Sequence, residues 1–478
     1  MNGAPFSFVG ANAYYLQQLA AHGDTAHVNE VFALAKSKGL RVIRTWGFFD
    51  SPDSLNPAVI QFRPGRLNER ALRALDFVLH QAELFGIKLI LPLVNNWEEF
   101  GGMNQYVQWY ASSQPGRTKF PQSFTRQNQN KNESARIEGA IGRSYRVSVA
   151  DGFVHDDFYR IEEIRRWYRS YVGMVLSRVN TYNGRVYKND PTILMWELAN
   201  EPRSSERTGE LVRSWVAEIA GFAKSIDRNH LIGTGEEGFD ISGAGYQTAE
   251  QYGGQAWLFD GTAGISFSKN LQDPNIDVAS IHLYSDTWKI GAENGSLWIV
   301  DHAEISRRLG KPLILGEFGI QTKKSLVYRA WLNTIVNSAA SGGLVWQLVY
   351  EGRNDVDGYS ISCSRDPLVC DVLSSSGRLL SERDVGLLQP PTRTNLAQNF
   401  PNPFNETTVI EYEIGSEGHA QLEIFNELGQ RVTTLFEGWE PRGRYVMLFE
   451  GKGLASGVYF YRLTTGKFME TKKFLYLK

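Results

Sequence analysis

Residues 193–203 read ILMWELANEPR, an apolar run of strand length that ends abruptly at Asn200, Glu201 and Pro202. Residues 312–319 read PLILGEFG, and there a second short apolar run ends on Glu317. A strand followed by an ordinary polar turn explains either stretch taken alone. It does not explain why a glutamate follows two separate strands. The repetition therefore predicts two carboxylates that converge from different strands of one barrel.

Strand-like runs and amphipathic helical patterns alternate over about the first 350 residues. The eight runs span residues 7–13, 41–46, 88–94, 193–200, 230–237, 277–284, 312–319 and 343–349. Helical patterns between them include residues 69–86 and 157–180. Apolar strands that are each followed by a helix indicate a parallel sheet covered on both faces, and eight of them close into a (β/α)8 TIM barrel. A doubly wound open sheet also explains the alternation, but it gives no reason for glutamates after the fourth and seventh strands.

Length and composition agree with a barrel plus a second domain. A chain of 478 residues is longer than one typical barrel of about 250 residues. Lys and Arg number 50 against 52 Asp and Glu, and this near balance argues against nucleic acid as a partner. The 12 Trp and 21 Tyr suit a neutral sugar polymer, because sugar C–H groups pack on aromatic faces, although most of these rings are expected in the core. No apolar run reaches the ~18 residues that predict a transmembrane helix.

Four further motifs accompany the two glutamates. They are GANAYYL at 10–16, RTWGF at 44–48, LVNNWEEFGG at 93–102 and HLYSDTW at 282–288. Together with NEP and GEFG, they resemble glycoside hydrolase family 5, a family of retaining TIM-barrel enzymes, and within it the endo-β-mannanases. The resemblance spans roughly residues 5–385. It implies a monomer that hydrolyses internal β-1,4 bonds of mannan, glucomannan or galactomannan without a cofactor or a metal ion. A β-1,4-glucanase (cellulase), an exo-acting β-mannosidase and a catalytically inactive carbohydrate-binding barrel are the alternatives.

A retaining glycosidase needs two carboxyl groups about 5 to 5.5 Å apart in different protonation states. The resemblance implies that Glu201 is the acid/base and that Glu317 is the nucleophile. Their mutual repulsion should move their pKa values apart, and a nearby cation should stabilise the ionised carboxylate of the nucleophile. Arg44, at the end of the second predicted strand, matches the family position of that cation. An ordinary surface ion pair is the alternative for this arginine.

The same resemblance implies a set of substrate-binding residues: Arg44, Trp97, Asn200, Arg203, His282, Tyr284, Trp288 and Trp346. Asn200 would bind the sugar 2-hydroxyl, and Trp346 would floor the subsite next to the cleaved bond. His282 and Tyr284 are two positions apart in one strand, so their side chains point the same way. The family uses them to orient the acid and to hold the nucleophile. Simple packing is the alternative for the members of the set that lie in loops.

A long polar insertion covers about residues 101–152. Its Gln, Asn, Ser, Gly and Arg content is too polar to add core, so we expect a loop that walls a cleft on the C-terminal face of the barrel. Trp109 and Tyr110 would offer sugar contacts there. A merely solvated loop is the alternative.

Only two cysteines are present, Cys363 and Cys370. The short segment between them, which contains Pro367, can close a disulfide, and this would suit an oxidising compartment. Two free thiols are the alternative. No cluster of Cys and His with metal-ligand spacing stands out.

The chain changes character after about residue 385. Residues 387–395, LLQPPTRTN, have the composition of a linker. Short alternating runs follow, separated by Gly and Asn turns, and they predict a small antiparallel β-sandwich. The predicted organisation is a catalytic barrel at 1–385, a linker at 386–395 and a β-sandwich at 396–478.

The tail has its own motifs: NFPNPFN at 399–405, FNELGQRV at 425–432, SGVYFYRL at 456–463 and a Lys-rich end. They resemble the C-terminal sorting domain of the bacterial type IX secretion system. This resemblance implies export through outer-membrane secretion machinery to the cell surface or the medium. The N-terminus lacks the pattern of a signal peptide, so an exported form would have lost it by cleavage. A carbohydrate-binding module is the alternative, although Trp439 is the only tryptophan of the tail.

Overall fold

The computed structural model describes residues 4–114, 148–150, 152–241, 249–355 and 357–478. Eight parallel strands form one sheet in the order β10-β11-β12-β1-β2-β5-β8-β9, and a parallel bridge between Gly233 and Val278 joins β9 to β10. The strands are β1 (Phe8–Asn12), β2 (Val42–Arg44), β5 (Lys88–Pro92), β8 (Ile193–Glu197), β9 (Leu231–Gly233), β10 (Ala279–Leu283), β11 (Leu313–Phe318) and β12 (Ala340–Val345). Each of the eight predicted runs overlaps one of them, and the predicted TIM barrel is confirmed.

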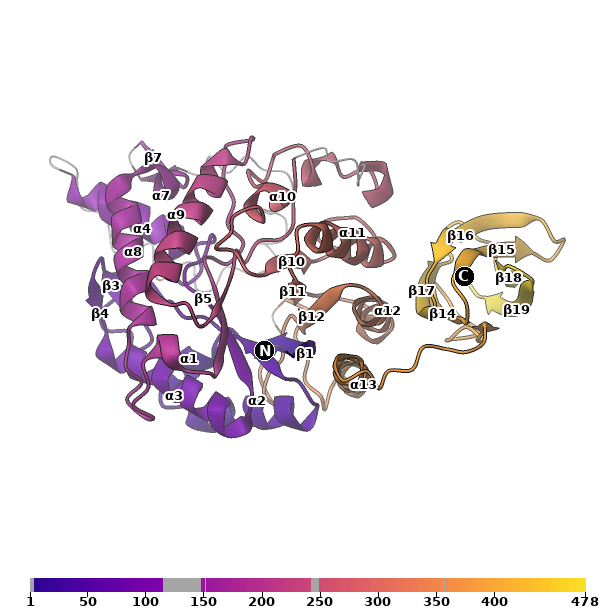
Figure 1. The fold of residues 1–478 in the computed structure, drawn as a ribbon, viewed down its shortest axis with the longest axis horizontal. Coiled ribbons are helices and arrows are strands. Elements are labelled where there is room, and N and C mark those ends of the chain that lie inside the picture. The colour runs from indigo at the N-terminus through magenta and orange to yellow at the C-terminus, as the bar shows by residue number, and fades with distance from the viewer. Residues whose placement is uncertain (1–3, 115–147, 151, 242–248, 356) are drawn as a thin grey trace.

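Helices surround this sheet (Figure 1). They are α1 (Leu16–Ala21), α2 (Thr25–Ser37), α3 (Glu69–Phe85), α4 (Gly102–Ser113), α7 (Asp157–Arg160), α8 (Glu162–Leu176), α9 (Glu210–Ile226), α10 (Phe267–Asn270), α11 (Asn294–Arg308), α12 (Lys324–Asn337) and α13 (Pro367–Asp384). Local sequence sets their ends. In α3, for example, the Asn68 side chain accepts from the backbone N–H of Arg70, and Gly86 ends the helix at φ 74°. None of the helices in the described ranges combines the length and the apolar character that crossing a bilayer needs.

The inside of the barrel changes from apolar to polar along the strands. Eight buried side chains form an apolar cluster inside it: Phe8, Val42, Ile90, Leu194, Met195, Val278, Ile314 and Leu344. Positions further along the same strands carry buried polar groups, among them Asn12, Arg44 and His282. Because the apolar positions come first along the strands, the polar groups gather at the C-terminal ends, where TIM-barrel active sites lie.

The predicted insertion at 101–152 begins with a helix rather than a loop. Trp109 and Tyr110 lie on α4, where Trp109 packs edge-on against Tyr106, and Tyr110 packs edge-on against Phe153. The two rings therefore pack against neighbouring aromatic side chains, and the helix corrects the expectation of a loop at these positions. Two short strands, β6 (Ser148–Ala150) and β7 (Phe153–Val154), close the insertion. The predicted cleft wall at residues 115–147 lies outside the described residues.

Cys363 and Cys370 are bonded in a disulfide, with their Cα atoms 5.7 Å apart. The bond ties the segment after β12 to the first turn of α13. Arg383, in the last turn of α13, donates to backbone carbonyls at the end of α12 and the start of β12. Because these bonds hold α13 against the barrel, the helix is part of the barrel through its last turn.

The tail is a two-sheet antiparallel sandwich, as predicted. One sheet has the order β13-β14-β17, and the other has the order β16-β15-β18-β19. The strands are β13 (Asn395–Leu396), β14 (Thr407–Ile414), β15 (Gly418–Asn426), β16 (Arg431–Glu440), β17 (Gly443–Glu450), β18 (Gly457–Thr465) and β19 (Phe468–Tyr476). Its own apolar core includes Ile410, Leu422 and Tyr461. Helix α13 ends at Asp384 and β13 begins at Asn395, next to the predicted division at 385 and 396, which stays a prediction.

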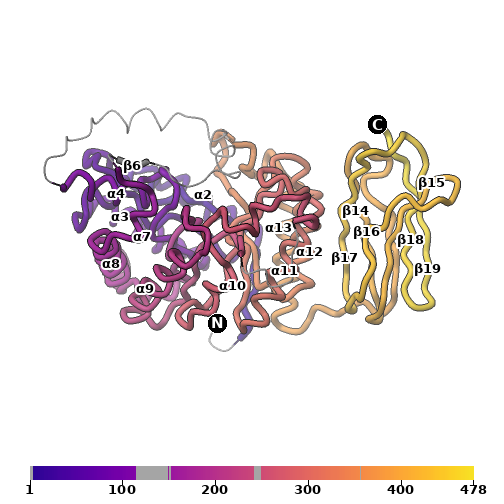
Figure 2. The backbone as a smooth tube through the Cα atoms, turned by 90° about the horizontal axis from the view of Figure 1, so that it is seen from above, coloured from indigo at the N-terminus to yellow at the C-terminus, as the bar shows by residue number. Residues whose placement is uncertain are grey.

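The sandwich packs on the barrel beside α12 (Figure 2). Val409 and Leu448, from β14 and β17, are buried in the same apolar cluster as the barrel helices. Lys323 donates to Thr407 over 2.6 Å and pairs with Glu406 at 2.8 Å. This face of the tail therefore covers apolar surface of the barrel.

Candidate active site

The alternation of side chains along the strands delivers polar groups to the centre of the barrel. Val42 belongs to the apolar interior, and Arg44, two residues later, points the same way. Glu197 follows Met195 by the same interval. Both Arg44 and Glu197 are fully buried. The strands thus place a guanidinium and a carboxylate in the interior without any loop.

Glu317 reaches the centre through a β-bulge in β11. Leu315 pairs with Ile281, but the next residue of β10, His282, pairs with Glu317, so that Gly316 is the extra residue. Leu315 packs outward in the cluster under the helices, and simple alternation would send Glu317 outward as well. The bulge reverses this direction, which is a common use of bulges beside active sites. A Cβ at position 316 would lie 2.8 Å from Ser280 Oγ, so the position suits glycine.

Glu201 lies just past the end of β8 in a left-handed backbone conformation, with φ at 51°. This conformation is uncommon outside glycine and occurs where the surrounding structure holds it. The backbone N–H of Glu201 donates to the Gly235 carbonyl at 2.8 Å. Its carboxylate accepts from Trp97 Nε1 at 2.5 Å and from His282 Nδ1 at 2.7 Å. Both oxygens of the carboxylate are therefore held in place.

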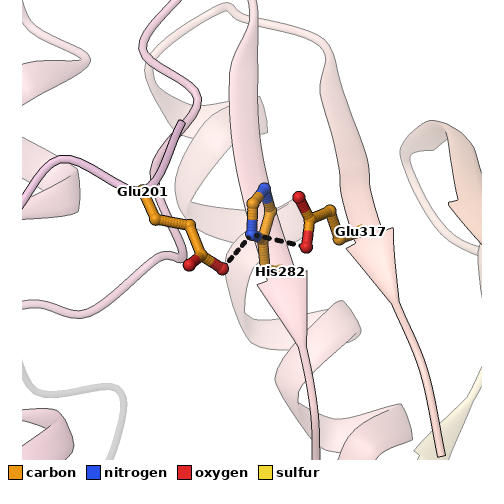
Figure 3. Close-up of side chains that lie close together, drawn as sticks. All are labelled: Glu201, His282 and Glu317. Atoms are coloured by element: carbon orange, nitrogen blue, oxygen red, sulfur yellow. Dashed lines mark hydrogen bonds and ion pairs between the residues drawn. The ribbon is translucent and has the colours of Figure 1, made fainter. Parts of the chain in front are cut away.

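The two predicted carboxylates converge on His282 (Figure 3). His282 Nδ1 lies 2.7 Å from Glu201 and 3.6 Å from Glu317. One oxygen of each carboxylate and this nitrogen all lie within 4.8 Å of one another. Among the described residues, this is the set of His, Cys, Asp and Glu side chains compact enough to hold a metal ion. The same spacing suits a retaining glycosidase, in which the two carboxyl groups are about 5 to 5.5 Å apart.

Arg44 joins Glu317 to the rest of the site. Its Nη1 donates to Glu317 Oε1 at 2.7 Å and its Nη2 donates to Asn200 Oδ1 at 2.8 Å. Asn200 Nδ2 donates in turn to Asn95 at 3.0 Å. The other oxygen of Glu317 accepts from the Tyr284 hydroxyl at 2.5 Å. The predicted partners Arg44 and Tyr284 therefore bind Glu317 directly, and Asn200 joins the group through Arg44.

The surroundings move the pKa values of the two glutamates apart, but in the order opposite to the expected protonated acid/base and ionised nucleophile. Burial raises the pKa of Glu317, against the opposing charges of His282 and Arg44. Burial also acts to raise the pKa of Glu201, but His282, Arg203 and Trp97 outweigh it and lower this pKa to about 2. The charges of Glu317 and Glu201 raise the pKa of His282 despite its burial. The lowered pKa favours ionised Glu201 in the free site, whereas the raised pKa values of His282 and Glu317 favour their protonated forms.

The remaining predicted residues form aromatic surroundings. Trp346 stacks on Tyr14, with ring centres 5.4 Å apart and planes 10° apart. The Arg203 guanidinium lies 5.3 Å from the Trp97 ring centre. Trp288 is only 1% exposed and packs edge-on against Phe239 and Trp298. Its burial favours a packing role over direct contact with a ligand.

The sequence pattern alone did not identify four residues around this site: Asn12, Tyr14, Glu197 and Glu237. Glu197 and Glu237 are buried acids that bind the guanidinium groups of Arg44 and Arg203. Glu197 carried a detectable signal, because an acidic residue is unexpected within an apolar strand. For Asn12 and Tyr14, the signal was their place in the GANAYYL motif.

Comparisons with known proteins agree with this geometry. Residues 1–339 match the glycoside hydrolase family 5 β-mannosidase-like family, and residues 398–476 match the secretion system C-terminal sorting domain. Mannan endo-1,4-beta-mannosidase 5 of Solanum lycopersicum is 33% identical over 404 residues, which cover 80% of this chain and 86% of that protein. Mannan endo-1,4-beta-mannosidase 8 of Oryza sativa subsp. japonica is 34% identical over 402 residues, 79% of this chain and 96% of that protein.

Solved structures are similar as well. The endo-beta-1,4-mannanase from Thermotoga petrophila aligns with a TM-score of 0.71 at 26% identity, over 99% of this chain and 98% of that chain. The endo-1,4-beta-mannanase from Rhizomucor miehei aligns with a TM-score of 0.64 at 30% identity, over 80% of this chain and 97% of that chain.

Proposed function

We infer that the chain, which belongs to the β-mannosidase-like members of glycoside hydrolase family 5, is a retaining endo-β-1,4-mannanase. Its substrates are the internal β-1,4-mannosidic bonds of mannan, glucomannan or galactomannan. The observation that carries the retaining mechanism is the spacing of Glu201 and Glu317, whose nearer oxygens lie within 4.8 Å. An inverting enzyme needs about 6.5 to 9.5 Å between its carboxyl groups, to admit a water molecule.

In the first step, Glu317 attacks the anomeric carbon and forms a covalent glycosyl-enzyme bond. The glycosidic oxygen leaves with a proton from Glu201. Because the free site favours ionised Glu201, we propose that this proton comes through the 2.7 Å hydrogen bond from His282 Nδ1 to Glu201. The Glu201–His282 pair thus acts as the acid, and its protonation belongs to the pair rather than to either group.

In the second step, Glu201 takes a proton from a water molecule, whose oxygen attacks the anomeric carbon and releases Glu317. Two displacements at the same carbon return the original β configuration. In the free site, Arg44 and Tyr284 hold the two oxygens of Glu317. We propose that Asn200, which is hydrogen-bonded to Arg44 and Asn95, binds the sugar 2-hydroxyl. That bond strengthens as the oxocarbenium-like transition state forms.

The tail suits export. Residues 398–476 match a secretion sorting domain, and such domains direct their cargo to the secretion machinery. We propose that the outer-membrane type IX system is the partner of this domain, and that the enzyme acts as a monomer at the cell surface or in the medium. If the tail were a carbohydrate-binding module instead, its removal would weaken binding to insoluble mannan.

Assays on four polymers test the substrate proposal. Purified full-length protein is given mannan, galactomannan, glucomannan and carboxymethylcellulose, and viscosity and reducing ends are followed together. We expect viscosity to fall on mannan before much reducing sugar appears. Higher activity on carboxymethylcellulose than on the mannans would indicate a cellulase. Mannose as the sole product from chain ends would indicate an exo-acting enzyme.

A further inference from the structure

Glu197 is a fully buried acid inside the barrel that the two catalytic steps do not use. Its Oε2 accepts from Arg44 Nε at 2.7 Å, and both side chains are 0% exposed. Its Oε1 has no hydrogen-bond partner among the described residues. Burying a carboxylate is unfavourable unless a cation compensates it, and here Arg44 supplies that cation.

Arg44 is shared between two carboxylates and two amides. Nε donates to Glu197 and Nη1 donates to Glu317, both at 2.7 Å. Nη1 also donates to Asn12 at 3.2 Å, and Nη2 donates to Asn200 at 2.8 Å. A guanidinium is rigid and planar, so a fixed bond at Nε also fixes the directions of both terminal nitrogens. The bond to Glu197 therefore orients the guanidinium of Arg44, and with it the hydrogen bond from Nη1 to Glu317.

Because Arg44 contacts two carboxylates, its positive charge acts on Glu197 as well as on Glu317. Glu317 faces Arg44 from β2, His282 from β10, Tyr284 just beyond β10, and Glu201 beyond β8. Arg44 is the permanent cation of this group, and the carboxylate of Glu197 on the same guanidinium adds a negative charge that opposes the attraction of Arg44 for Glu317. A nucleophile whose carboxylate is over-stabilised attacks poorly, since basicity and nucleophilicity fall together. A second carboxylate on the same guanidinium opposes that loss.

We propose that Glu197 is a positioning residue for the nucleophile. It sets the plane of the Arg44 guanidinium and limits the electrostatic stabilisation of the Glu317 carboxylate by Arg44. The proposal rests on the assignment of Glu317 as nucleophile. The proposal adds that Glu197, without contacting substrate, controls the acid limb of the profile of kcat/KM against pH.

The test compares kcat/KM for mannan of E197Q, E197D and the wild-type chain between about pH 3 and pH 9. In E197Q, one negative charge near Arg44 is lost, so the pKa of Glu317 should fall. We expect the acid limb to move to lower pH by about one unit, the low end of the effect of one nearby charge. E197D keeps the charge but retracts it from Nε, so the acid limb should stay while kcat/KM falls by ~10- to 100-fold through misplacement.

A matched control is E236Q. Glu236 is also fully buried, burial raises its pKa to about 8, and its oxygens accept from Asn270 at 3.3 Å. The glutamine variant imitates the protonated acid, so E236Q should keep the wild-type profile. Circular dichroism spectra establish that each variant is folded, and E197D carries the test alone if E197Q does not fold.

The outcomes separate this proposal from the proposed function. A wild-type chain that does not hydrolyse mannan contradicts the function itself. If the wild-type chain is active, an unshifted acid limb in folded E197Q overturns the role of Glu197. Full kcat/KM in E197D overturns it too, because the position of the charge would then be irrelevant.

Discussion

Replacing Trp97 by phenylalanine tests how the site controls its proton. The change keeps an aromatic ring beside Arg203 but removes the Nε1–H that donates to Glu201 at 2.5 Å. A hydrogen bond to a charged group contributes about 1.5 to 3 kcal/mol, and one pKa unit corresponds to about 1.36 kcal/mol. This bond lowers the pKa of Glu201, so its loss should raise that pKa by about 1 to 2 units.

The assay is the pH dependence of kcat/KM for mannan. If the Glu201–His282 pair supplies the proton, as proposed, the basic limb reports the loss of that proton, and W97F should move this limb to higher pH. Trp109→Phe is the matched control, because Trp109 Nε1 has no hydrogen-bond partner in the part of the chain that the structure describes. A basic limb that stays in place or moves to lower pH in W97F would refute the reasoning, and so would an equal shift in both variants.

Further changes address the separate parts of the site. E317A should lose the covalent intermediate, and azide should restore its activity with inverted product. Azide should restore the activity of E201A on aryl glycosides with retention of configuration. The product configuration, determined by NMR, checks both. Trp346→Ala should weaken transition-state binding, as calculated from kcat/KM, by on the order of 1.5 to 3 kcal/mol, the scale of one buried aromatic platform. An unchanged kcat/KM would contradict the role of Trp346. A chain that ends after Leu388 should hydrolyse soluble mannan and bind insoluble mannan as the full chain does, but melt a few degrees lower because α12 loses its cover; an unchanged melting temperature would show that the tail adds no stability.

The fold was predictable because it depends on repeated local patterns. Eight apolar runs separated by amphipathic helices allow few arrangements, and strands such as Leu313–Phe318 lie within a few residues of their predicted positions. The convergence of Glu201 and Glu317 was also predicted from sequence, since each follows an apolar run. Helix α13 was not among the predicted elements, and its place on the barrel depends on bonds from Arg383 to distant backbone carbonyls.

The contacts inside the site depend on details that alternation does not predict. Glu317 points inward only because the bulge at Gly316 shifts the register, and Glu201 has a left-handed backbone conformation. The pairing of Glu197 with Arg44 joins two strands that are not neighbours in the sheet. The lowered pKa of Glu201 depends on Trp97 and His282, which come from two other segments of the chain. Such features follow from tertiary structure, so the sequence indicated the residues but not the division of charge among them.

Product configuration tests the central claim most directly. Proton NMR of the full-length chain acting on a mannan oligosaccharide, recorded before mutarotation, shows which anomer of the new reducing end forms first. The spacing of Glu201 and Glu317 predicts the β anomer. The α anomer as the first product would contradict the double displacement and the assignment of Glu317 as nucleophile.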